Sequence, residues 1–67
     1  MQQPEIPARL IPVLRLVAQG KRNKTIANEL SLAEHTVENY IAELFDLCGV
    51  ESRTELALAA RDNDLAE

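Results

Sequence analysis

The sequence predicts a single all-α domain of four helices, and three observations lead to that fold class. Apolar side chains recur at intervals of three and four residues, which is the periodicity of an amphipathic helix. Alanine, leucine, glutamate and arginine, which favour helix, dominate the second half of the chain. The 67 residues contain few β-branched runs and suffice for one domain. We expect that domain to occupy residues 1–67, with a core of about 6–61 and flexible termini.

The first helix is expected at about residues 8–19. Pro12 lacks a backbone N–H and clashes inside a regular helix, so it should lie near the first turn or mark a kink. Gly20 is well placed to end the helix in the left-handed conformation. The apolar stripe of this helix consists of Leu10, Val13, Leu14 and Val17.

A second, shorter helix is expected near residues 24–30. It follows a polar link of Lys21, Arg22 and Asn23, in which Asn23 is a favourable N-cap residue. Its apolar face consists of Ile26, Ala27 and Leu30. A turn at 31–33 then leads into the next helix.

The third helix is the longest, at about residues 34–48. Gly49 should close it, and Val50 should pack back against it. The apolar side of this helix carries Val37, Ile41, Leu44, Phe45 and Cys48. On that stripe Cys48 is most simply a small core residue.

The last helix is expected near residues 53–61. Ser52 should cap it, because Glu55 stands three residues on, in the second position of a capping box. Its inward face should consist of Leu56, Ala59 and Ala60. The tail from Asp62 onward should fray.

The second and third helices have the proportions of a helix-turn-helix. A short helix, a turn of about three residues and a longer helix with a polar outer face make up this motif. The shorter helix braces the longer one, so that the polar face of the longer helix protrudes. In DNA-binding versions the protruding helix enters the major groove with its N-terminal end first.

Five segments carry a family resemblance: 13–20 (VLRLVAQG), 23–27 (NKTIA), 34–39 (EHTVEN), 47–50 (LCGV) and 52–56 (SRTEL). In this order they resemble the LuxR-type (GerE-like) helix-turn-helix DNA-binding domain. The resemblance implies a four-helix fold, a third helix that reads duplex DNA and a fourth helix that serves as a dimerisation surface. In such proteins the domain usually follows a sensor or receiver domain. The chain is therefore expected to be a stand-alone member or an excised C-terminal domain.

The resemblance also implies the site residues. Lys24 matches a phosphate-contacting position at the start of the second helix. Thr36, Val37 and Asn39 match positions near the N-terminal end of the third helix, which enters the groove. The expected DNA-binding residues are Lys21, Arg22, Asn23, Lys24, Thr36, Val37, Asn39 and Tyr40. The expected surface for a homodimer, or for a heterodimer with another helix-turn-helix regulator, comprises Leu47, Arg53, Leu56, Leu58 and Arg61.

Acidic side chains on the third helix depart from the family pattern. Residues 9–24 carry five cations and no acid, whereas residues 29–67 carry ten acids and two arginines. Duplex DNA is a dense line of negative charge, so acids on the reading helix oppose binding, although one acid at a base edge can accept from cytosine N4. The acidic departures are Glu38, Glu43 and Asp46. The family typically has lysine at 38, serine at 33 and glycine at 31.

Two further interpretations of the charges stay open. A solvated helix face also explains Glu43 and Asp46, and to a lesser extent Glu38, and a solubilising loop also explains the basic link at 21–24. Alternatively, the motif is impaired in DNA binding and acts as a protein-interaction module, an anti-activator or heterodimer partner, through its acidic third helix and its fourth helix.

An enzyme is not expected. The chain has one histidine (His35) and one cysteine, and it lacks a glycine-rich phosphate loop and any metal-ligand spacing. We therefore predict no catalytic residue, metal, cofactor or small-molecule substrate. A lone cysteine, no secretory signal and no apolar run near the roughly 18 residues of a membrane span predict a cytoplasmic protein without a membrane partner.

Overall fold

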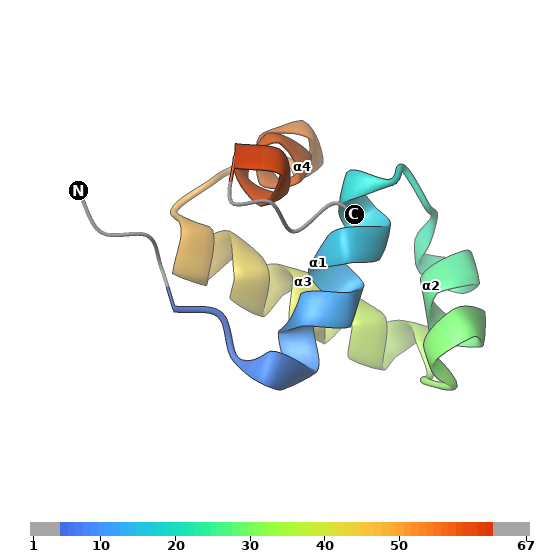
Figure 1. Cartoon of the computed structure of the whole chain (residues 1–67). Helices are drawn as coiled ribbons and strands as arrows, with labels where there is room; N and C mark the ends of the chain where they lie inside the picture. Colours follow the sequence, from blue (N-terminus) through green and yellow to red (C-terminus); the bar gives the residue numbers. More distant parts are fainter. Residues whose placement is uncertain (1–4, 63–67) are drawn as a thin grey trace.

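The computed structural model describes residues 5–62, which form helices and contain no strand (Figure 1). The predicted all-α class with four α-helices is therefore confirmed. The elements in chain order are η1 (Ala8–Leu10), α1 (Ile11–Ala18), α2 (Asn23–Leu30), α3 (Glu34–Cys48) and α4 (Arg53–Asp62). Asp62 is still helical, and the rest of the tail that was expected to fray lies outside the described residues.

Pro12 divides the first predicted helix in two. The chain first turns through the 3-10 helix η1, in which the Leu10 N–H donates to the Pro7 carbonyl at 2.9 Å. It then enters α1, whose first turn holds Pro12. Because proline has no N–H to donate, the first turn is the place where a helix tolerates it. The helix expected over 8–19 is thus a 3-10 turn followed by an α-helix, with Pro12 in the expected first turn.

Helices α1, α2 and α3 end in the same left-handed motif. One residue at each end has a positive φ: Gly20 at 82°, Ser31 at 57° and Gly49 at 66°. The N–H of the next residue donates to a carbonyl five positions back, at 3.0, 2.8 and 3.1 Å respectively, which is the Schellman arrangement. The predicted ends at Gly20 and Gly49 are confirmed. At the end of α2, Ser31 adopts a backbone conformation that favours glycine.

The N-terminal ends of α2 and α4 differ from each other. Ser52 Oγ accepts a hydrogen bond from the Glu55 N–H at 3.1 Å, so the predicted cap of α4 is confirmed. The prediction that Asn23 caps α2 was wrong. The helix begins at Asn23 itself, and Arg22 occupies the cap position without a side-chain bond. The Asn23 side-chain oxygen instead accepts a hydrogen bond from Arg53 at 2.7 Å.

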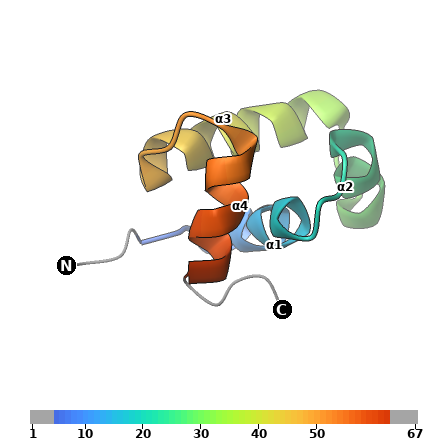
Figure 2. The same cartoon turned by 90° about the horizontal axis from the view of Figure 1, so that it is seen from above.

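Helix α1 is the centre of the packing. It contacts α2, α3 and α4, and α2 and α4 lie on different sides of it (Figures 1 and 2). The residues described bury no polar or charged side chain, so the interior is held by apolar packing alone. The buried side chains are Leu10, Val13, Leu14, Val17, Ala18, Ile26, Ala27, Val37, Ile41, Leu44, Leu56 and Ala60.

Some residues expected inside lie at the edge of this core. Phe45 and Cys48 are half-buried and pack against the buried cluster, and Ala59 is half-buried on α4. Desolvation raises the pKa of the Cys48 thiol, which lowers the fraction of reactive thiolate. Cys48 therefore behaves as the small packing residue that its position on the apolar stripe predicts.

Candidate nucleic-acid interface

Helices α2 and α3 form the predicted helix-turn-helix. They pack against each other across the turn at 31–33, and α2 lies at the N-terminal end of α3 (Figure 2). The inner side of α3 is fixed by Val37, Ile41 and Leu44, which are all buried. The opposite side is therefore held away from the core. The exposed residues on that outer face of α3 are His35, Glu38, Asn39, Ala42 and Asp46.

The N-terminal end of α3 is without a side-chain cap. Ala33 occupies the cap position with φ −73° and ψ 150°, and as an alanine it makes no side-chain hydrogen bond. Its carbonyl accepts the N–H groups of Thr36 and Val37 at 3.1 and 3.2 Å. The first N–H groups of a helix carry the positive end of its dipole and suit an anion. This end of α3 therefore presents a positive partial charge, which the exposed carboxylate of Glu34 in the first turn partly offsets, and the helix has no lysine or arginine.

The structure divides the expected DNA-binding residues into accessible and inaccessible ones. Lys21, Arg22, Lys24 and Asn39 are exposed, and Asn23, Thr36 and Tyr40 are half-buried. Val37 was wrongly expected to contact DNA, because its side chain is fully buried. It lies on the apolar stripe of α3 and holds that helix on the core.

Arg53 fastens α4 to the basic link. Its guanidinium donates to Asn23 Oδ1 and to the Lys21 carbonyl, each at 2.7 Å. These bonds hold the Lys21 backbone and the Asn23 side chain at the start of α2, next to the exposed side chains of Lys21 and Lys24. Two of its donors are thus engaged within the chain, and the expectation that Arg53 also serves a partner surface stays a prediction.

One of the acids expected to oppose DNA is compensated. Glu43 forms a salt bridge with Arg9 of η1, and the Arg9 guanidinium also lies 5.9 Å from the centroid of the Tyr40 ring. Glu43 is thus not the free charge that the sequence suggested. No hydrogen bond or ion pair within residues 5–62 engages the exposed carboxylates of Glu38 and Asp46. The sequence offered no local signal for this ion pair, which joins residues 34 positions apart.

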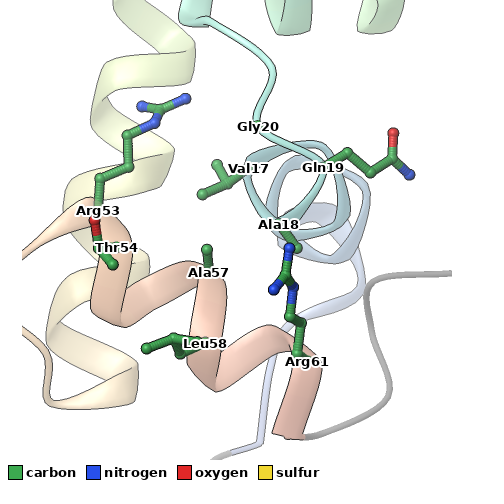
Figure 3. Close-up of a pocket in the computed structure, with 9 residues that line it drawn as sticks. All are labelled: Val17, Ala18, Gln19, Gly20, Arg53, Thr54, Ala57, Leu58 and Arg61. Carbon is green, nitrogen blue, oxygen red and sulfur yellow. The ribbon is translucent and has the colours of Figure 1, made fainter.

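A groove of about 360 Å³ runs between α4 and the end of α1 (Figure 3). Arg53 and Arg61 stand at its two ends, with Ala57 and Leu58 between them on α4. Leu58 is 51% exposed, a large fraction for a leucine. Arg61 and Leu58 belong to the expected partner surface, and their role stays a prediction.

Two other residues of the expected partner surface lie elsewhere. Leu56 is fully buried, so it belongs to the inward face of α4 and was wrongly assigned to a partner surface. Leu47 is 37% exposed near the end of α3 and does not line the groove beside α4.

Within residues 5–62, no group of three or more histidine, cysteine, aspartate or glutamate side chains is arranged to hold a metal ion. None of the helices in this range is long and apolar enough to cross a membrane.

Comparison with known proteins gives consistent results. The sequence model of the bacterial regulatory proteins, luxR family, matches residues 8–60. Response regulator Rre1 of Synechocystis is 46% identical over 55 residues, which are 82% of this chain and 24% of Rre1. The DNA-binding transcriptional activator DevR/DosR of Mycobacterium tuberculosis is 42% identical over 75% of this chain and 23% of its own length. The transcriptional regulatory protein DesR of Bacillus subtilis is 42% identical over 75% of this chain and 25% of its own length. The chain thus spans about a quarter of the length of these relatives.

Proposed function

We propose that this chain, which belongs to the luxR family of bacterial regulatory proteins, binds duplex DNA through its helix-turn-helix and thereby regulates transcription. The observation that carries the proposal is the orientation of α3. Its apolar side is locked into the core, while Glu38, Asn39 and Ala42 stand on a free outer face. A helix held in this way can enter the major groove and bring side chains to base edges.

The basic link supplies the phosphate contacts in this proposal. Lys21, Arg22 and Lys24 are exposed at the start of α2, where the helix dipole also favours an anion. Phosphate contacts fix the orientation of a protein on the duplex and provide most of its sequence-independent affinity. The bonds from Arg53 to the Lys21 carbonyl and to the Asn23 side chain hold this link in place.

Fluorescence anisotropy with a pool of random duplexes at low salt tests the proposal. We expect binding that weakens steeply as salt is raised, because counterions are released when phosphates are neutralised. Lys24→Glu should weaken binding to all sequences alike and reduce the salt dependence. Arg15→Glu makes the same change in net charge on the exposed side of α1 and serves as the control. Absence of any binding at low salt would refute the proposal.

We further propose that two copies of the chain associate through α4. The exposed Leu58 and the adjoining groove support this, because a large apolar side chain gains free energy when it is buried against a partner. Sedimentation equilibrium should detect a dimer, and Leu58→Asp should shift it to monomer. Thr25→Asp, at an exposed position of α2, should leave the dimer intact. A wild-type chain that stays monomeric at all concentrations would exclude this pairing.

The free carboxylates of Glu38 and Asp46 support a second candidate function, a protein-interaction module that captures a basic partner or a related regulator. The double substitution Glu38→Lys and Asp46→Lys separates the two. If the wild-type chain binds no duplex and the double variant does, the acids have suppressed DNA binding and the second function is favoured. If both bind, the first function stands.

Family membership also underlies our remaining expectations. We infer that the chain works in the cytoplasm, where bacterial DNA lies, and that it binds without catalysing a reaction and without a cofactor.

A further inference from the structure

From the free carboxylate at position 38, we infer that Glu38 sets sequence specificity by accepting a hydrogen bond from the N4 amino group of a cytosine in the major groove. The inference rests on the proposed binding of duplex DNA and assigns one residue of α3 to one base. An acid that opposes overall affinity would thereby select the site.

The structure separates Glu38 from the neighbouring acids of the same helix. Glu43 is occupied by Arg9, so its charge is compensated within the chain. Glu38 is exposed in the second turn of α3 and has no hydrogen-bond or ion-pair partner among residues 5–62. Asp46 is also exposed and free, but it lies two turns further from the N-terminal end. Glu34 is exposed and free as well, but it is the first residue of α3, where its charge meets the positive end of the helix dipole. Beyond the first turn, Glu38 is the free acid nearest the end that enters the groove.

Close approach at this position is sterically open. Ala42 follows Glu38 by one helical turn on the same face and has no side chain beyond Cβ. Asn39, the next residue, is exposed as well and can form two hydrogen bonds with an adenine edge. The outer face at this level therefore combines one pure acceptor with one donor–acceptor group and leaves room for the duplex.

Hydrogen-bond chemistry selects the base. An ionised carboxylate can only accept hydrogen bonds. In the major groove guanine presents N7 and O6, both acceptors, and thymine presents the O4 acceptor, so both repel it. Adenine presents an amino donor beside the N7 acceptor, which partly cancels the attraction. Cytosine presents the N4 donor and is the best match.

The repulsion between Glu38 and the phosphates contributes to discrimination. It lowers affinity for every duplex, and the bond to cytosine offsets that loss only at the correct site. Removing the charge should therefore strengthen binding to random sequence and weaken selection for cytosine. A merely solvated acid would produce the first effect without the second.

Selection of bound sequences from randomised duplexes tests the inference with the wild-type chain, Glu38→Gln and Asp46→Asn. We expect wild type to enrich cytosine at one position of the site, and a C·G to T·A change there to weaken binding by about tenfold. Glutamine can both donate and accept, so Glu38→Gln should lose most of this penalty and bind random duplex more tightly. Asp46→Asn removes the same charge but should retain the preference for cytosine.

Three outcomes would overturn the inference. The cytosine preference could survive in Glu38→Gln, it could be lost equally in Asp46→Asn, or wild type could bind duplex without preferring cytosine at any position. In each of these cases the proposed DNA binding would stand. If wild type bound no duplex at all, the proposed function would fail and the inference with it.

Discussion

Arg9 reaches from the 3-10 turn at the beginning of the domain to the carboxylate of Glu43 on α3. The same guanidinium lies near the ring of Tyr40, one turn earlier on that helix. A residue outside the helix-turn-helix thus neutralises one acid of the helix that we propose reads DNA. The net charge of α3, as a duplex meets it, is less negative than its sequence suggests.

Arg9→Ala should weaken duplex binding several-fold, because it removes a cation and frees the charge of Glu43. Both side chains are about half exposed, so the pair itself should contribute at most about 1 kcal/mol to the free energy of unfolding. Anisotropy titrations at constant salt measure the first effect. The double variant Arg9→Ala with Glu43→Gln should recover part of the loss. If Arg15→Ala weakens binding as much as Arg9→Ala, the effect is only that of net charge.

Ser31→Gly should stabilise the domain by about 0.5–1 kcal/mol, because Ser31 adopts a left-handed conformation that costs an L-residue free energy. The equivalent positions on α1 and α3 are already glycine. Urea unfolding followed by circular dichroism measures the change. In the opposite direction, Gly49→Ala should lower the free energy of unfolding by a similar amount. A Cβ at this position meets no neighbouring atom, so the substitution strains only the backbone conformation. A stability unchanged by both substitutions would contradict this account.

Ala33→Ser should raise the free energy of unfolding by about 1 kcal/mol. The backbone at Ala33 already has the extended conformation of a cap residue, so a serine oxygen can accept a free N–H of the first turn of α3. Thermal melts measure the gain. Ala42→Ser places the same side chain on an exposed middle turn of α3 and should be neutral or slightly destabilising. An equal effect at both positions would show that capping is not the cause.

Arg53→Ala should destabilise the domain by about 1–3 kcal/mol, because two hydrogen bonds from a charged donor are lost. Arg53→Lys should recover little, since an ammonium cannot present the same forked donors to Asn23 and Lys21. Arg61→Ala on the same helix is the matched control, because Arg61 is exposed. Equal stability of the two alanine variants in urea would argue against a structural role for Arg53.

Local patterns predicted most of the fold. Gly20 and Gly49 mark helix ends because only a residue without a Cβ adopts the left-handed conformation cheaply. Ser52 and Glu55 mark the start of α4 by a capping bond that depends on residues three apart. In contrast, Asn23 has the composition of a cap, but its side chain bonds to Arg53, 30 residues away, and no local pattern reveals such a contact.

The candidate site was less predictable than the fold. Val37 was assigned to the DNA contact by its position in a motif, although its place on the apolar stripe already indicated burial. Leu56 was assigned to a partner surface although it lies on the apolar face of its own helix, and it too is buried. The pair Arg9–Glu43 could not be predicted, because it depends on how η1 packs beside α3. The net charge of a sequence segment therefore does not give the charge of the folded surface, because some charged side chains are paired with distant residues.

Titration of the isotope-labelled chain with a duplex, followed by amide NMR shifts, tests the central claim most directly. We predict that the largest shifts fall on the outer face of α3 and on the basic link, at Glu38, Asn39, Ala42 and Lys24, while the amides of Leu58 and Arg61 on α4 move little. Shifts concentrated on α4, or no shifts at low salt, would contradict the claim that α3 reads DNA.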